Sequence, residues 1–323
     1  MMRKIYVLLV FVLLVSLPSC YEDYIKDFDY TSVYFAQQTN VRTFVVGEGM
    51  QIKVGVALGG VRENTLDREV GFMLDNSLLT DELLASMKTG VDHVKNYVSS
   101  VSELHPLPSD YYTLSNSSKM IIEKGDHKGV ITIKADSVKF LADANTLIAN
   151  YALPFYITDA QADSIISDKR FSVIGLRYEN MLFGNYWHGG VTEVKDASGN
   201  IVETIKYYTT IPSPETKVMK LQTVASHSLT TNRISDNSGS FKITLDGNTI
   251  IVSKADGSNV EVLPDGESSF NRAKLLQDRK IYLKYKYDNG DGTTSHATDT
   301  LTFRNRIRDG VNEWQDEDPD NYK

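Results

Sequence analysis

Residues 241–252 read FKITLDGNTIIV, and this stretch decides the fold of the second half of the chain. Two runs rich in β-branched and aromatic residues flank the triplet Asp246-Gly247-Asn248. An Asp-Gly pair between two such runs is among the strongest short sequence signals for a β-hairpin. We therefore predict two antiparallel strands that are joined by a tight turn at this triplet.

The same pattern extends outward on both sides of this hairpin. Further strand-like runs, separated by turns rich in Gly, Asp and Asn, lie at 191–194, 201–208, 217–224, 260–262, 281–287 and 299–303. About eight sequential strands is the number with which a small up-and-down barrel closes. Repeated hairpins also fit an open sheet, but closure removes two exposed edges. We expect a roughly eight-stranded meander barrel over residues 184–314, followed by an acidic tail at 315–323.

The first half of the chain also reads as strands. Residues 51–57 alternate polar and apolar side chains, which indicates a half-buried strand. Other strand-like runs lie at 32–36, 41–46, 69–74, 119–123, 129–133, 152–158 and 171–176, and the turn at 124–126 predicts a hairpin between two of them. Many non-local strands with few helices favour an antiparallel β-sandwich. We place it at residues 30–178, with a linker at 179–183, so the predicted fold class is all-β.

Helical signals are confined to one stretch, Asp81 to Leu107. Thr80 precedes two acidic residues, as expected for an N-cap, and valines then recur at spacings of three and four before His105. This predicts two short helices in an insertion that could cover or build a site.

The N-terminus carries an export signal. Met1–Lys4 is basic, and the apolar run Ile5–Val15 is shorter than the roughly 20 residues that cross a bilayer. Leu17-Pro18-Ser19-Cys20 then resembles a lipobox. We expect a signal peptide at 1–19, a lipid on Cys20 that anchors the protein in a membrane, and an acidic tether at 20–29. The alternative is an ordinary secretory signal with an incidental cysteine.

Composition argues against several classes of site. Cys20 is the only cysteine, so neither a disulfide nor a thiolate metal site is expected. The net charge of −8 would become −10 once Arg3 and Lys4 were removed, which disfavours nucleic acid as a partner. The six histidines lack metal-ligand spacing, and no nucleotide-binding or nucleophile motif occurs. We expect no cofactor, no metal and no enzymatic activity. The acidic turn 288–292 could hold calcium, although a solvated hairpin turn is the favoured interpretation.

Aromatic side chains are the best candidates for ligand contact, because sugar rings stack on aromatic planes. The predicted ligand-binding residues are Tyr186, His188 and Tyr208. We interpret Trp187 as barrel core. The arginines that alternate over 304–308 are expected to pair with local carboxylates and to fix the C-terminal segment, and Trp314 to pack back over them.

Several longer stretches resemble a Bacteroidetes family of surface lipoproteins. They are residues 29–36, 41–43, 58–64, 111–115, 184–190 and 299–314. The resemblance implies an immunoglobulin-like N-terminal domain, a lipocalin-like C-terminal barrel, and a lipid-anchored position in the outer membrane, facing outward. Its gene setting is similar to that of starch-utilisation-type uptake systems. This implies non-catalytic binding of a polysaccharide or oligosaccharide for a neighbouring outer-membrane transporter. The alternative is a structural or adhesive envelope protein that contacts other proteins.

Overall fold

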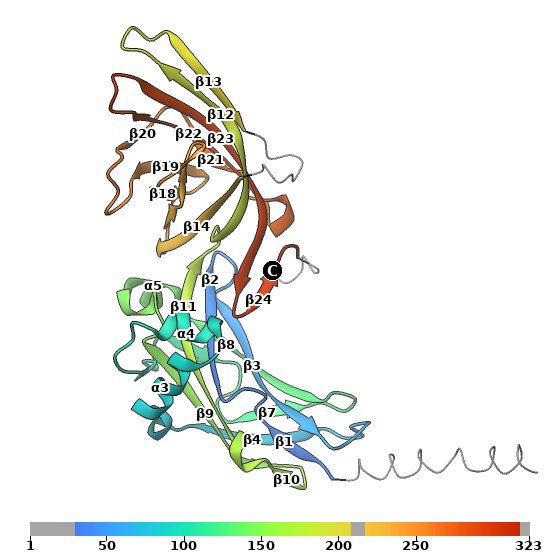
Figure 1. Ribbon diagram of the computed structural model, residues 1–323. Helices are drawn as coiled ribbons and strands as arrows, with labels where there is room; N and C mark the ends of the chain where they lie inside the picture. Colours follow the sequence, from blue (N-terminus) through green and yellow to red (C-terminus); the bar gives the residue numbers. More distant parts are fainter. Residues whose placement is uncertain (1–29, 208–216, 317–323) are drawn as a thin grey trace, which may run out of the picture.

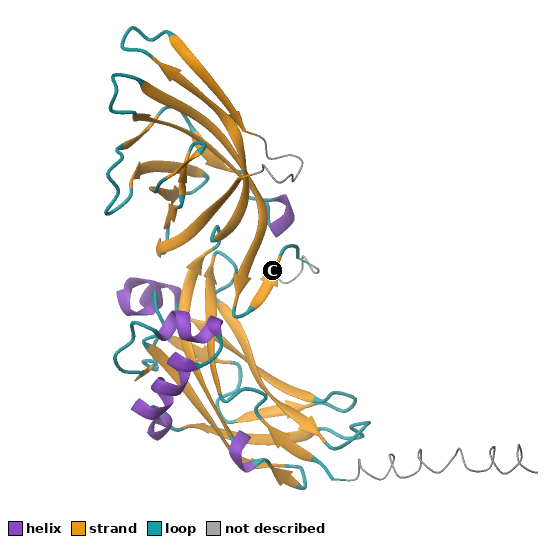
Figure 2. Ribbon diagram, in the orientation of Figure 1, coloured by secondary structure: helices purple, strands orange, loops and turns teal. Residues whose placement is uncertain are grey.

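The computed structural model describes residues 30–207 and 217–316. The chain forms two β-lobes that are stacked end to end (Figure 1), and strands dominate both lobes (Figure 2). The predicted all-β fold class is therefore confirmed. No helix within the described ranges is long and apolar enough to cross a membrane.

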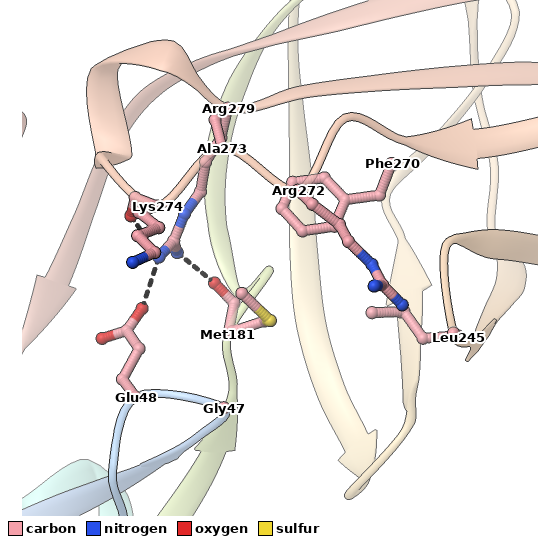
Figure 3. Close-up of a pocket in the computed structure, with 10 residues that line it drawn as sticks. Gly47, Glu48, Met181, Leu245, Phe270, Arg272, Ala273, Lys274 and Arg279 are labelled. Carbon is pink, nitrogen blue, oxygen red and sulfur yellow. Dashed lines mark hydrogen bonds and ion pairs between the residues drawn. The ribbon is translucent and has the colours of Figure 1, made fainter. Parts of the chain in front are cut away.

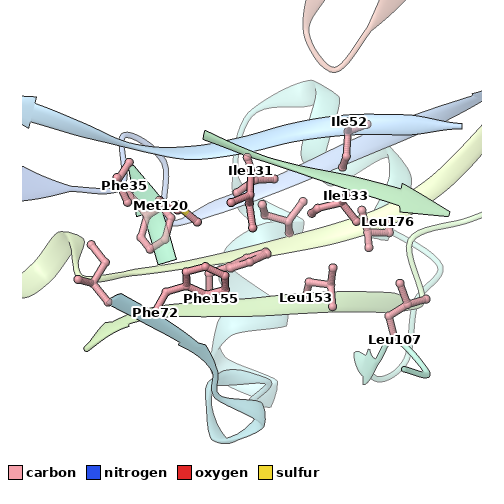
Figure 4. Packing of buried hydrophobic residues seen from close by; sticks show 14 of the residues in the cluster. Phe35, Ile52, Phe72, Leu107, Met120, Ile131, Ile133, Leu153, Phe155 and Leu176 are labelled. Atoms are coloured by element: carbon pink, nitrogen blue, oxygen red, sulfur yellow. The ribbon is translucent and has the colours of Figure 1, made fainter. Parts of the chain in front are cut away.

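The first lobe is a sandwich of two sheets. One sheet has the strand order β10 (Ser164–Ile165), β1 (Ser32–Tyr34), β3 (Gln51–Gly59), β8 (Lys128–Ala135), β6 (Tyr112–Leu114). The other has the order β2 (Thr39–Val46), β11 (Phe171–Asn180), β9 (Tyr151–Ala160), β4 (Arg68–Leu74), β7 (Lys119–Ile122), and β5 (His105–Pro106) pairs with β9. Inward side chains such as Ile52, Ile131 and Phe155 form the core between them (Figure 4).

The pairing of these strands differs from the prediction in two respects. The sandwich is not wholly antiparallel, because β2 runs parallel to β11 along its full length, and β1–β10 and β5–β9 are also parallel. The predicted hairpin at 119–133 is wrong: β7 pairs with β4, whereas β8 pairs with β3 and β6 in the other sheet. Each of these two strands has one apolar face, and opposite sheets allow both faces to meet in the core.

The predicted helices are present in the insertion. They are α3 (Asp81–Thr89), which Thr80 caps by accepting a hydrogen bond from the Leu83 amide at 3.2 Å, and α4 (Asp92–Val98). Their apolar sides, with Met87 and Val98 fully buried, pack on the outer face of the β2–β11–β9 sheet. The remaining helices are short: α5 (Ser137–Ala142), η1 (Asn76–Leu78), η2 (Ala144–Thr146), η3 (Ser167–Lys169) and η4 (Leu276–Asp278).

The second lobe is a closed antiparallel barrel. Its ring runs through β12 (Gly184–Lys195), β14 (Lys217–Ala225), β15 (Ser228–Thr231), β18 (Phe241–Asp246), β19 (Thr249–Lys254), β21 (Ser268–Phe270), β22 (Lys280–Asp288) and β23 (Thr294–Arg308). Strand β23 pairs with β12 and closes the ring. The predicted number of about eight strands holds for the described ring, but its membership differs: β15 and β21 were not predicted, and the predicted strands at 201–208 and 260–262 correspond to β13 and β20 outside the ring. Asp246 pairs with Thr249, which confirms the tight turn. Outside the ring lie β13 (Ile201–Tyr207), β16 (Arg233–Ile234), β17 (Asn237–Ser238), β20 (Val262–Pro264) and β24 (Val311–Glu313).

The connection between the lobes is short and buried. Strand β11 continues to Asn180, so the predicted linker at 179–183 in fact begins inside a strand. The Asn180 amide donates to Thr223 Oγ1 at 3.0 Å, its side chain donates to the Ser226 carbonyl at 2.7 Å, and Leu182 is fully buried. The sandwich residue Val45 also belongs to the barrel core. The two lobes are therefore joined by packing as well as by the chain.

Candidate functional site

The structure places Tyr186 in the interior of the barrel. This β12 side chain is fully buried, its ring meets Phe303 edge-on at 5.6 Å between ring centres, and its hydroxyl donates to the Leu182 carbonyl at 3.1 Å. Burial raises the pKa of the Tyr186 phenol well above its usual value. Tyr186 therefore presents no ring face at the surface. Its role in ligand binding stays a prediction, and a ligand would have to enter the barrel to reach it.

His188 is also fully buried, at the centre of a polar network inside the barrel. Its Nε2 lies 2.8 Å from Asp299 Oδ2, which also accepts a hydrogen bond from the Tyr285 hydroxyl at 2.8 Å. The Tyr207 hydroxyl donates to the other carboxylate oxygen, and Ser235 donates its backbone amide to Tyr285 at 2.6 Å. The buried carboxylate of Asp299 has several hydrogen-bond donors, so little of its hydrogen-bonding capacity is lost on burial. The network fixes the relative positions of the four strands β12, β13, β22 and β23.

The tyrosines of this network stay protonated. Burial, and after it the charge of Asp299, raises the pKa of both Tyr207 and Tyr285 far above the usual value. Both phenols are thus fixed as hydrogen-bond donors to the carboxylate. Tyr208, the third predicted ligand residue, lies outside the described residues, as does Cys20.

Two neighbouring predictions need correction. Trp187 is not barrel core: Tyr186 and His188 point inward, so strand alternation turns Trp187 outward, where it is half-buried and the Arg304 guanidinium covers its ring at 4.6 Å. Trp314 is 57% exposed rather than packed back over the arginines. The arginine prediction holds for Arg306 and Arg308, which both pair with Glu313 at 2.5 Å.

A buried ion pair joins Glu48 of the sandwich to two arginines of the barrel. The sequence did not predict this pair. Glu48, in the turn between β2 and β3, accepts hydrogen bonds from Arg279 at 2.7 Å and from both terminal nitrogens of Arg306 at 2.9 and 2.8 Å (Figure 3 shows the Arg279 contact). Burial alone would raise the pKa of Glu48, but the hydrogen bonds and charges of Arg306 and Arg279 outweigh it and lower the pKa to about 2. Glu48 is therefore ionised at neutral pH.

Beside this junction lies a groove of about 470 Å³ whose lining comes from both lobes. The sandwich contributes Tyr97 of α4 and the β11 residues Arg177 and Glu179. The barrel contributes polar side chains of β12, β14 and β15, together with Phe183 and Ile307; the polar ones are Asn185, Lys220, Gln222, Thr223 and Thr230. The predicted insertion thus does help to build a hollow at the surface.

The floor of this groove is a buried charge pair. Arg177 Nη2 lies 2.7 Å from Glu179 Oε1, both side chains are less than a tenth exposed, and the ring of Tyr97 stacks on the guanidinium at 3.9 Å. Arg177 Nη1 and Glu179 Oε2 have no hydrogen-bond partner among the described residues. A buried polar atom without a partner costs roughly 1–3 kcal/mol, and a hydroxyl-rich ligand that reached it would recover part of this.

The described lining of the groove holds one carboxylate and several neutral polar groups. The carboxylate belongs to Glu179, whereas most glycosidases use two carboxylates across the scissile bond. No group of three or more His, Cys, Asp or Glu side chains in the described part of the chain could hold a metal ion. In the turn 288–292, Asp288 and Asp291 accept hydrogen bonds from the backbone amides of Gly290 and Thr293 at 2.7 and 2.9 Å.

Comparisons with known proteins extend over both lobes. A family model described as an N-terminal domain matches residues 28–164, whose described part, from residue 30 onward, lies in the sandwich. No curated protein matches the chain. A Bacteroides ovatus crystal structure of unknown function is 22% identical and superimposes with a TM-score of 0.63, covering 90% of this chain and 99% of its own.

Two further Bacteroides ovatus structures of unknown function also resemble the chain. They are 15% and 12% identical, with TM-scores of 0.43 and 0.38, and cover 90% of this chain and 98% and 96% of their own. The first of the three structures shares the two-lobed β-fold along nearly the whole chain. The chain is therefore similar in fold to a Bacteroides protein of unknown function, and its N-terminal lobe matches a family model.

Proposed function

We propose that this protein is a non-catalytic lipoprotein of the outer-membrane surface that binds glycan in the junction groove and presents it to a neighbouring outer-membrane transporter. The lipid on Cys20 would hold the two lobes at the membrane. The observation that carries the proposal is the composition of the groove, in which side chains that can bond hydroxyls surround an aromatic ring above a buried charge pair.

Each part of this lining suits a neutral sugar. Amide, ammonium and hydroxyl groups, such as Gln222, Lys220 and Thr230, can donate to or accept from sugar hydroxyls. Tyr97, Phe183 and Ile307 offer apolar surface to the C–H faces of a ring. Lys220 and Gln222 are exposed and lie on the same face of β14, two residues apart, as a ligand along the strand would require.

The test is affinity electrophoresis of residues 21–323 through gels that contain starch, xylan or mannan, followed by calorimetry with oligosaccharides of any polymer that retards the protein. Replacing Gln222 or Lys220 by Ala should weaken binding roughly tenfold or more, because each removes a polar contact to the ligand. Lys128→Ala, an exposed lysine on the sandwich, is the matched control and should bind like the parent. Equal binding by all three variants would place the site elsewhere.

A role in contacting other proteins is the second candidate. Three large apolar side chains on or next to the last hairpin, Ile307, Val311 and Trp314, are 57–60% exposed. Large exposed apolar side chains on one short hairpin favour a protein interaction surface. If no polymer retards the protein while Val311→Ser abolishes its retention by envelope proteins of its own host, this second function is favoured.

A further inference from the structure

A second hollow lies at the junction, between the β2–β3 turn and the end of the barrel. Its volume is about 350 Å³, within the range of small-molecule sites. One wall is apolar and consists of Phe270, Leu245 and Met181 (Figure 3). The loop between β21 and β22 carries Arg272 and Lys274 along its rim, and Arg272 extends between Phe270 and Leu245 in Figure 3.

The charge of this hollow is positive. Within residues 30–207 and 217–316, neither Arg272 nor Lys274 forms an ion pair, whereas Glu48 at the same hollow is already neutralised by two buried arginines. The chain as a whole carries a net charge of −8. The hollow is therefore a positively charged site on an otherwise acidic protein. Its two cations, unpaired among the described residues, favour the binding of an anionic ligand.

The loop that carries the two cations is held in a strained conformation. Arg272 has a φ of +53°, which costs a residue with a side chain of the order of 1–3 kcal/mol. Asn271 fixes the loop: its Oδ1 accepts from the amides of Lys280 and Ala273 at 3.0 and 3.3 Å, and its Nδ2 donates to the Asp278 carbonyl at 2.8 Å. Neighbouring contacts therefore hold the backbone of this loop in a strained conformation. Such enforced strain is common at binding sites, where it fixes the direction of a side chain.

We infer that this hollow binds a compact organic acid, whose carboxylate pairs with the Arg272 guanidinium and whose ring packs on the apolar wall beside it. The guanidinium of Arg272 can bind a carboxylate through two parallel hydrogen bonds, and Lys274, whose ammonium lies on the Glu48 side of the hollow in Figure 3, adds positive charge at longer range. The ring could belong to a uronic acid or to an aromatic acid, which share this chemistry. The inference concerns a different hollow from the junction groove and does not rest on the proposed function.

The probes are sodium glucuronate and phenylacetate, with glucose and phenylacetamide as their neutral counterparts. Calorimetric titration of residues 21–323 in low salt should show binding of at least one acid and not of its neutral counterpart, with weaker binding in 0.5 M salt as exposed charges are screened. The acid that binds identifies the source of the ring. Binding of neither acid, or equal binding of an acid and its neutral counterpart, would overturn the inference.

Charge-removing variants locate the site. Arg272→Gln should weaken binding of the acid about tenfold, as expected for the loss of a charged hydrogen bond, and Lys274→Gln should weaken it by less, because its ammonium acts only at longer range. Both side chains are exposed, so the variants should keep the melting temperature of the parent. Lys128→Gln removes the same charge from the sandwich surface and should leave binding unchanged. If the two hollow variants behave like Lys128→Gln, the acid binds elsewhere.

Discussion

The buried pair at the junction allows a quantitative prediction. Glu48→Gln keeps the shape and one acceptor of the side chain but leaves Arg279 and Arg306 facing a neutral amide. Arg306 retains its bond to Glu313 at 2.5 Å, so Arg279 becomes the less compensated charge. Removal of one partner from a buried ion pair typically costs about 3–5 kcal/mol, because the remaining charge stays desolvated.

The pKa of Glu48 gives a second route to the magnitude. The pKa falls from 4.5 to about 2 on folding, and this difference of about 2.5, at about 1.4 kcal/mol per pKa unit, corresponds to about 3–4 kcal/mol. A carboxyl whose pKa is lower in the folded than in the unfolded state stabilises the folded state at every pH above the unfolded pKa. This contribution is lost as the pH falls from the unfolded pKa through the folded pKa. The full effect should therefore be present above about pH 4.5 and decline towards pH 2.

Urea unfolding at pH 7 and at pH 3, followed by tryptophan fluorescence and circular dichroism, measures this effect. At pH 7, Glu48→Gln should unfold more readily by about 3 kcal/mol, and the difference from the parent should shrink at pH 3. The control is Glu69→Gln, whose partner Lys119 and own side chain are both about half exposed, so its loss should cost less than about 1 kcal/mol. A Glu48 variant no less stable than the Glu69 variant at pH 7 would refute the reasoning.

Three further predictions concern other parts of the chain. Cys20→Ala should abolish incorporation of radiolabelled palmitate, and continued labelling would contradict the lipid anchor. Brief digestion with subtilisin should leave the connection from Asn180 to Gly184 uncut, because Leu182 is fully buried and Asn180 is bonded to the barrel; an early cut there would show that the lobes separate. Asp299→Ala should lower stability by more than about 3 kcal/mol in thermal or urea unfolding, since it leaves His188 and two buried tyrosines without their acceptor; a loss under about 1 kcal/mol would contradict the network.

The parts of the fold that could be predicted depend on local signals. The turn at Asp246, the alternation of residues 51–57 and the helix cap at Thr80 each involve neighbours in sequence, and each is found in the structure. The parallel pairing of β2 with β11 joins strands that are more than a hundred residues apart, and no local pattern encodes it. The same holds for the Glu48 pair, whose arginines lie far along the chain.

Apart from the insertion that carries Tyr97, the residues of the candidate groove were missed for a related reason. The sequence suggested Tyr186 and His188 because aromatic residues beside glycines are compatible with a ligand platform, but strand alternation turns both inward. The better signal was the charge pair Arg177 and Glu179, which interrupts an otherwise apolar strand. Charged residues in such a strand are rarely buried unless they are paired, and a buried pair often marks a site.

Both hollows lie at the junction, so the proposed binding would depend on how the two lobes are held relative to each other. The junction groove takes Tyr97 and Arg177 from the sandwich and Gln222 from the barrel, and the second hollow places Gly47 opposite Phe270. Neither lining exists in a single lobe. Linked lobes ordinarily move relative to one another unless a substantial interface restrains them. Here the Glu48 pair, the bonded Asn180 and the buried Leu182 supply that restraint. These junction contacts would therefore pre-form the two proposed binding surfaces, which would lower the free-energy cost of ordering them when a ligand binds.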